Sequence, residues 1–459
     1  RCQLGDSLKA VITSAGGDLF IGPSKRNSSM PSFQTKMQID SAGIQSKSNY
    51  FGIKKGSYHL STEKNEKNLW PLDGELTFER LVLFASSFPL EIKMPENKIK
   101  LQEGEIRLEK AHLTIGRSDF TATGSLSNFG GRFFRDELMK GDLSIRSKFT
   151  DVNQMIKALN AGEKNEKAEE IDPNAKLVTI SDVETADSTA VFVVPKGVEF
   201  VWNTQLDEVK MGKITLKNLK GQVVLKDQKI AMNSLNMITN GAKMFTSSTY
   251  EAKSKQQANM AMDFKLMDID LANLIDMFPV LDSIMPMAGS FDGHVNFRMK
   301  GRAQIDANLG MAANKLELIA RILGKNMVIM DSETFRKMAK MLFFKDKEKN
   351  VIDEMSFALQ YNDQVLEVFP SEFQVDRYRV AVGGVQRLNG NYSFHVSVLK
   401  TPVPLVKMGI DVKGTAQGND FDLTNAKYKY FFAKKDKRRQ KADQELMARK
   451  EAVIKRLPF

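Results

Sequence analysis

Residues 392–398 read Tyr392-Ser393-Phe394-His395-Val396-Ser397-Val398, with a large apolar side chain at every second position. Because side chains alternate between the two faces of a β-strand, this pattern predicts a strand with one apolar and one polar face. Residues 355–361, Met355-Ser-Phe-Ala-Leu-Gln-Tyr361, alternate in the same way and run into turn residues at Asn362-Asp363. Both stretches therefore predict strands of an antiparallel sheet.

Short apolar runs of this kind, separated by polar turns, recur through most of the 459 residues. Further examples lie at 106–108, 113–115, 120–126, 214–216, 223–225 and 230–232. Strands spaced by about 8–12 residues are typical of an antiparallel meander, sandwich or barrel. With 42% hydrophobic and 27% charged residues, the composition is that of a folded chain rather than a disordered one. The sequence therefore predicts a mainly β protein.

Helical spacing of apolar residues is confined to a few short stretches. It occurs at 152–159 after Asp151, at 271–278 after Asp270, and at 335–342. Each is predicted to be a short amphipathic helix. Residues 161–190 are polar and rich in charge, and they predict a mobile insertion or a domain boundary.

The net charge of +11 is concentrated near the C-terminus. Residues 427–456 hold twelve Lys or Arg against four acidic residues, and the remainder is close to balance. Tyr428 to Phe432 resemble the end of a strand, and 434–455 predict a solvated helix. A soluble basic terminus, attraction to anionic lipid head groups and nucleic-acid binding are all open interpretations; no nucleic-acid motif accompanies the charge. The membrane-surface candidates are Lys434, Lys435, Lys437, Arg438 and Arg439.

Residue patterns for catalysis or metal binding are missing. There is no phosphate-binding glycine loop, no GxSxG elbow, one cysteine, and four histidines that stand far apart without an HExxH motif. His395 falls on the polar side of its strand, which favours a surface histidine over a general base. We therefore expect no enzyme activity, no metal site and no cofactor.

From about Val209 onward, a series of motifs resembles the AsmA-like family of bacterial envelope proteins. The motifs that carry the resemblance are Met211-Gly-Lys-Ile-Thr-Leu-Lys-Asn-Leu-Lys-Gly221, Thr239-Asn-Gly-Ala-Lys-Met-Phe-Thr-Ser-Ser-Thr-Tyr250, Asp268-Ile-Asp-Leu-Ala-Asn-Leu-Ile-Asp276, Asp376-Arg-Tyr-Arg-Val-Ala-Val-Gly-Gly384 and Val398-Leu-Lys-Thr-Pro-Val-Pro404. Residues 75–150 resemble earlier copies of the same β-unit. The resemblance covers about half of the chain.

The resemblance implies an elongated, twisted antiparallel sheet curled into a groove that is apolar inside and polar outside. It also implies a periplasmic protein of a Gram-negative envelope, anchored in the inner membrane by an N-terminal helix that this chain lacks. Its partners would be phospholipids and an outer-membrane or other envelope protein, with no nucleic acid. We expect N-terminal groove repeats at 1–150, a helix and insertion at 151–190, the AsmA-like region at 191–432 and the basic tail at 433–459.

Three functions are consistent with these patterns. The first is a groove that binds or conducts phospholipids between the inner and outer membranes. The second is an envelope assembly or scaffold factor that regulates outer-membrane biogenesis without carrying lipid, and the third is an enzyme such as a carbohydrate-active β-protein. Under the first, the residues expected to line the groove are Met355, Phe357, Leu359, Phe394, Val396 and Val398.

Overall fold

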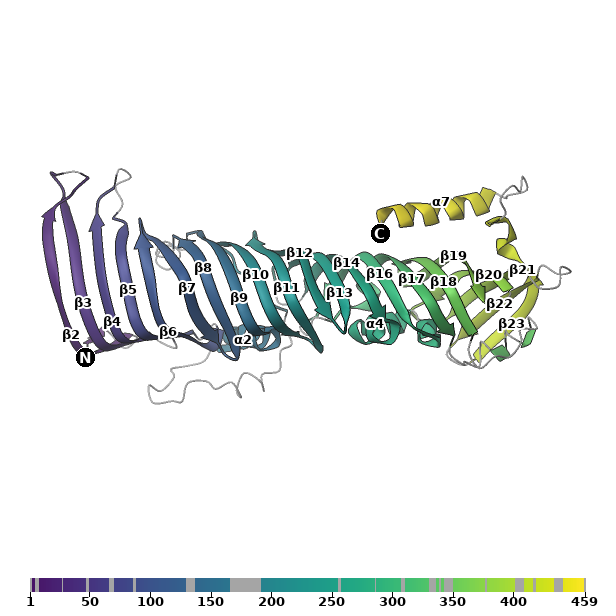
Figure 1. Cartoon of the computed structure of the whole chain (residues 1–459), viewed down its shortest axis with the longest axis horizontal. Coiled ribbons are helices and arrows are strands. Elements are labelled where there is room, and N and C mark those ends of the chain that lie inside the picture. The colour runs from purple at the N-terminus through teal and green to yellow at the C-terminus, as the bar shows by residue number, and fades with distance from the viewer. Residues whose placement is uncertain are drawn as a thin grey trace. The chain divides into compact units, whose positions relative to one another are not determined.

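The structure is a computed structural model of the whole chain (Figure 1). It describes residues 2–457 apart from 5–7, 27, 47–48, 66–69, 86–87, 129–136, 166–190, 255–256, 285, 307–309, 330–335, 338–339, 342–349, 376–377, 401–407, 416–417 and 433–440. The chain is mainly β, with 73% of it in strands. The described strands form one twisted mixed sheet of 23 strands that does not close into a barrel, with a few short helices. The predicted groove-like β fold is confirmed.

The chain divides into two compact units, 1–237 with 250–258 and 238–249 with 259–459. The first unit contains β1 (Cys2–Leu4), β2 (Leu8–Pro23), β3 (Pro31–Ser46), β4 (Asn49–Glu63), β5 (Leu72–Ala85), β6 (Phe88–Gln102), β7 (Glu105–Ile115), β8 (Ser118–Ser127), β9 (Met139–Asp151), α2 (Val152–Asn165), β10 (Val198–Met211) and β11 (Ile214–Lys226). The division falls within β12 (Lys229–Thr239), β13 (Ala242–Glu251) and β14 (Ala258–Asp270).

The second unit contains α4 (Leu271–Met277), α5 (Pro279–Ile284), η1 (Pro286–Ser290), β15 (Phe291–Asp292), β16 (His294–Ile305), η2 (Ala313–Lys315), β17 (Glu317–Ile329), β18 (Asn350–Asn362), β19 (Val365–Val375), β20 (Tyr378–Arg387), β21 (Tyr392–Lys400), β22 (Met408–Thr415), β23 (Gly418–Asn425), η3 (Lys427–Tyr430) and α7 (Lys441–Arg456). The alternating stretches 355–361 and 392–398 lie in β18 and β21, as predicted.

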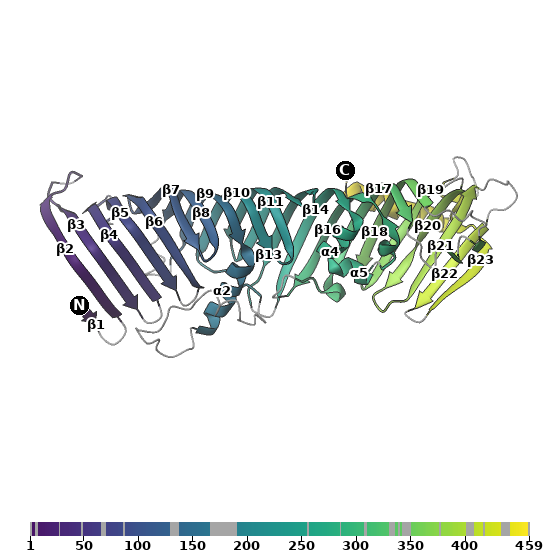
Figure 2. The same ribbon diagram turned by 60° about the horizontal axis from the view of Figure 1, so that its bottom comes forward.

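One strand pair departs from the expected antiparallel order. β9 and β10 pair in parallel, with Leu143 opposite Trp202. Parallel neighbours cannot be joined by a tight hairpin, because the chain must return to the end at which it started. Helix α2 begins that return (Figure 2). The predicted helix at 152–159 is therefore present, and residues 161–165 extend it; residues 166–190 of the predicted insertion lie outside the described part of the chain.

Several long strands are interrupted near their middle by a residue with positive φ. In β7 this residue is Lys110, with φ of 56°. Glu109 and Lys110 are both exposed, whereas Leu108 and Ala111 on either side of them pack in the same apolar cluster. The strand therefore keeps one apolar face although its simple alternation breaks. Lys55, Asn218, Ser234 and Asn326 adopt the same conformation in β4, β11, β12 and β17.

Helix α4 begins and ends close to its predicted limits. Asp270 is its N-cap, and the carboxylate accepts a hydrogen bond from the Asn273 N–H at 3.1 Å. Such a cap satisfies one of the free N–H groups of the first turn. The helix ends at Met277, and Pro279 begins α5. The predicted stripe at Phe335, Met338, Ala339 and Leu342 lies outside the described residues.

The C-terminal segment differs from the prediction in two ways. Residues 427–430 form a 3-10 helix and not a strand end, because the last strand already ends at Asn425. Helix α7 is not a fully solvated helix: Val453 is buried with Ala358 and Phe369 of the sheet. The Arg449 side chain forms an ion pair with Glu367. The prediction failed because most residues of the helix are charged or polar. Its apolar side consists of Leu446, Val453 and Ile454.

Candidate functional site

The first unit has one apolar face, which we define by its buried cluster. The cluster comprises Ile53, Phe78, Leu81, Met94 and Ala111, contributed by four consecutive strands from β4 to β7. At one end, Leu90 packs against Ala158 of α2. Among the described elements of this unit, only α2 adds a layer to the sheet. Burial of the cluster therefore reflects mainly the curl of the sheet itself.

A continuous apolar row crosses ten strands of this face. Its members stand directly opposite one another from β2 to β11, and they are Gly17, Met37, Tyr58, Leu76, Ile99, Leu108, Gly124, Leu143, Trp202 and Val223. With neighbouring strands about 4.8 Å apart, the row extends over roughly 40 Å of sheet. No charged residue interrupts it.

Every side chain in this row from Met37 to Val223 is only half-buried. Half-buried side chains still present apolar surface to their surroundings, and a contiguous apolar surface of this kind marks a site of interaction. We call this row, with the cluster beside it, the open apolar face. It is the candidate functional site of the protein.

The corresponding face of the second unit is closed. Leu359, Val368, Gly384, Phe394 and Val412 form a comparable row in neighbouring strands. The four side chains in that row are at most 8% exposed. This face is therefore packed as a core.

The structure brings the six predicted lining residues onto this closed face. Met355, Leu359, Phe394, Val396 and Val398 are buried, and Phe357 is half-buried against the ring of Phe373 at 5.8 Å. Sequence alternation thus identified an apolar face, but it carries no information about what covers that face. The sequence analysis did not predict the residues of the open apolar face. Alternating apolar residues in β10, namely Phe200, Trp202 and Leu206, could have indicated that face in the same way.

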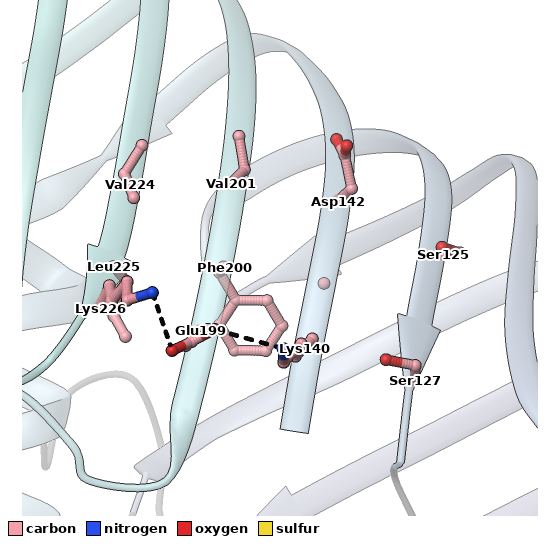
Figure 3. A pocket seen from close by; sticks show the side chains of 11 residues that line it. Ser125, Ser127, Lys140, Asp142, Glu199, Phe200, Val201, Val224, Leu225 and Lys226 are labelled. Atoms are coloured by element: carbon pink, nitrogen blue, oxygen red, sulfur yellow. Dashed lines mark ion pairs between the residues drawn. The ribbon is translucent and has the colours of Figure 1, made fainter. Parts of the chain in front are cut away.

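A cavity of about 300 Å³ lies at the ends of β8–β11 (Figure 3). Phe200 and Leu225 point to the same face as Trp202, whereas Val201 and Glu199 alternate with them and point to the other face. The carboxylate of Glu199 lies 3.7 Å from the Lys140 ammonium and 3.3 Å from the Lys226 ammonium. Asp142 also lines the cavity, so two ammonium groups and two carboxylates meet there and the lining has no net charge.

The cavity depends on a glycine in β9. A Cβ atom at Gly141 would lie 2.3 Å from the Phe200 ring and 2.8 Å from Leu126. Any side chain there would have to displace the ring, which stacks on Trp202 at 5.6 Å. Gly141 therefore allows Phe200 to lie across β9.

His395 is buried, and the prediction of a surface histidine was wrong. Only 4% of it is exposed, because η3 covers the polar face of β21. Its Nδ1 lies 2.7 Å from Asp411 Oδ1, and its Nε2 lies 2.8 Å from Ser397 Oγ. The backbone N–H of Lys427 donates to Nε2 at 3.0 Å, and that of Tyr428 donates to Ser397 Oγ at 2.9 Å.

This Ser-His-Asp arrangement is not accessible to a substrate. Ser397 is 0% exposed, and the backbone of η3 lies over both reactive atoms. Because the Lys427 N–H points at Nε2, that nitrogen must be unprotonated, so Nδ1 carries the proton and donates it to Asp411. Burial lowers the pKa of His395, and the hydrogen bond that Nδ1 donates to Asp411 only partly offsets this effect. The histidine is therefore held neutral.

The five basic residues proposed for the tail, Lys434, Lys435, Lys437, Arg438 and Arg439, lie outside the described residues. Among the residues that are described, no helix is both long and apolar enough to cross a membrane. The same residues contain no group of three or more His, Cys, Asp or Glu placed to hold a metal ion.

Comparisons with known proteins found no match. No family model matches the sequence, and neither a curated protein nor a solved structure is similar to the chain.

Proposed function

We propose that the protein binds phospholipids along the open apolar face of its first unit and conducts them between the inner and outer membranes of a Gram-negative envelope. It would be a periplasmic member of the AsmA-like family, anchored in the inner membrane. The proposal rests on one observation above all: the row from Met37 to Val223 is apolar across nine strands and yet only half-buried.

Acyl chains fit such a surface for a simple physical reason. Burying apolar area removes it from water at about 25 cal/mol per Å², so an apolar chain lying along the row gains stability without any specific hydrogen bond. A row without charges also allows an acyl chain to slide, because no step requires a polar contact to be broken.

The strand ends offer a place for a head group. The cavity at these ends contains the Lys140 and Lys226 ammonium groups on either side of the Glu199 carboxylate, and Asp142 also lines it. The two ammonium groups can donate charge-assisted hydrogen bonds to a phosphate group at the sheet edge. Phe200 and Leu225, which point to the other face of the same strand ends, suit the first methylenes of an acyl chain. This combination favours phospholipids over uncharged apolar ligands.

Lipid extraction tests the proposal directly. The protein, purified without added lipid and washed in mild detergent, is expected to carry phospholipid that mass spectrometry detects in amounts comparable to the protein. Lipid-free protein that instead copurifies with a stable protein partner would support the assembly or scaffold function and contradict the proposal.

A further inference from the structure

The polar side of β21 contains a buried hydrogen-bond cluster that the lipid-binding proposal does not use. It consists of His395, Ser397, Asp411 and Lys427, and it joins β21 and β22 to the 3-10 helix η3. Ser397 and His395 together accept the N–H groups of two successive η3 residues. The backbone of η3 is thus fastened to the sheet through one imidazole and one hydroxyl.

The packing around the imidazole leaves little freedom. The His395 ring lies edge-on to the Tyr428 ring at 5.1 Å, and Tyr428 in turn packs against Phe431 at 5.4 Å. A Cβ atom at Gly409 would lie 2.5 Å from His395 Cε1. Because the ring cannot move toward the sheet, any change in its hydrogen bonding must be accommodated by η3.

Protonation of His395 changes this hydrogen bonding in a defined way. The charged ring carries N–H groups on both nitrogens, so Nε2 ceases to be an acceptor. The Lys427 N–H, 3.0 Å away, would then face another N–H group, and a buried donor would lose its acceptor. The Ser397 hydroxyl oxygen cannot replace that acceptor, because its two lone pairs would then receive the Tyr428 N–H and the Nε2–H of the charged ring, 2.8 Å away.

We propose that this cluster is a proton-sensitive clasp, which holds residues 426–431 on β21 while His395 is neutral and releases them when His395 is protonated. Release would uncover the apolar rings of Tyr428 and Phe431, which are otherwise packed against the polar face of β21.

The charged groups around the ring set the direction of the effect. From β22, the Asp411 carboxylate favours the protonated ring; from η3, the Lys427 ammonium opposes it, and Lys427 is itself paired with Asp411 at 2.7 and 2.8 Å. Tyr428 of η3 presents an uncharged ring, and Gly383 stands opposite on β20. Burial outweighs the attraction of Asp411 and lowers the pKa of His395.

The lowered pKa of His395 determines how docking of η3 depends on pH. Above the ordinary histidine pKa of about 6.5, His395 is neutral in both the docked and the released state. As the pH falls below that value, the released state takes up a proton before the docked state does, so docking of η3 weakens. The clasp is therefore closed at neutral pH and opens in mild acid.

Hydrogen exchange followed by mass spectrometry tests the clasp on the full chain. After correction for intrinsic rates, protection of the Lys427 and Tyr428 amides is expected to fall by up to about tenfold for each pH unit between the ordinary pKa and that of the docked ring. His395→Gln keeps polar atoms but cannot be charged in this range, so its protection should not change with pH. His59→Gln, at an exposed histidine, should behave like the wild type.

A second measurement keeps the test decisive if His395→Gln does not dock η3 at any pH. In wild-type protein labelled with ¹⁵N-histidine, Nε2 of His395 should be unprotonated at neutral pH, and the ring should titrate at the lower end of the pH range over which protection is lost. Protection that is constant from pH 7.5 to 5, or that falls equally in His395→Gln, would overturn the proposal. So would titration of His395 without any change at residues 427 and 428.

Discussion

Val396 of β21 stands directly opposite Ile410 of β22, and both side chains are buried on the apolar face of the second unit. An open groove at this position would leave Val396 in contact with solvent or lipid. The packing around Ile410, which is 0% exposed, identifies a core instead. The two units thus use the same kind of apolar face differently.

Val396→Asp is therefore expected to destabilise the second unit by on the order of 3 kcal/mol or more, because it buries an unpaired carboxylate. Val351→Asp in β18 is the matched control: Val351 is 42% exposed, and the same substitution should cost under about 1 kcal/mol. Urea unfolding followed by circular dichroism measures both. A Val396→Asp variant as stable as the control would show that the face opens to solvent.

Substitution of the polar neighbour Ser397 is also expected to be costly. Alternation places Ser397 on the side opposite Val396, where a sequence alone predicts a solvent-exposed serine. In the structure Ser397 is fully buried beneath η3, so both faces of β21 are covered. The polar face is covered by η3, a segment about 30 residues away along the chain. The alternation of residues within a strand does not predict such a contact.

The sequence also could not predict how the strands of the open apolar face are aligned with one another. Alternation predicts which residues of one strand share a face, but the row from Met37 to Val223 depends on which residues of different strands stand opposite one another. Mid-strand residues such as Lys110, with φ of 56°, also shift the alternation within a strand. What the sequence could predict was the class of fold, the existence of apolar faces and the helices that follow Asp151 and Asp270.

Val453→Asp is expected to detach α7 from the sheet without unfolding the strands. Val453 packs on Ala358 and Phe369, and a carboxylate there would lose its water. Faster cleavage of residues 441–456 in limited proteolysis, with unchanged β-signal in circular dichroism, is the expected result. Ala452→Asp, at the exposed neighbouring position, should be cleaved like the wild type. Equal cleavage of both variants would contradict the docking of α7.

Lys450 should make the docking of α7 depend on pH in the alkaline range. Burial, with a smaller effect from Arg321, lowers the pKa of Lys450 to about 8. Between about pH 8 and the ordinary value of 10.5, the undocked state binds the extra proton, so wild-type stability should rise with pH relative to Lys450→Met. Urea unfolding of the two proteins across pH 7.5–10.5 measures the difference. A constant difference would contradict the assignment.

The basic tail remains a prediction for the membrane surface. Replacing Lys434, Lys435, Lys437, Arg438 and Arg439 with serine should weaken binding to anionic vesicles at low salt, since each cation contributes about 1 kcal/mol near such a surface. The effect should vanish at high ionic strength and on uncharged vesicles. Helix α7 stays intact in this variant, so equal vesicle binding by variant and wild type would exclude the role.

Trp202 lies on the open apolar face, so its fluorescence can detect lipid bound there. The chain has only two tryptophans, so Trp70→Phe leaves Trp202, next to the β11 end of the row, as the single tryptophan. Leu206→Asp places a carboxylate on the same face of β10. Gln205→Asp places one on the opposite face, between Lys220 and Arg146, and serves as the control.

The decisive measurement is the quenching of Trp202 fluorescence by phospholipid brominated on its acyl chains, in the Trp70→Phe background. We predict strong quenching that persists in Gln205→Asp and is largely lost in a folded Leu206→Asp variant. Absence of quenching in the parent protein, or equal quenching in the two aspartate variants, would contradict the binding of acyl chains along this face.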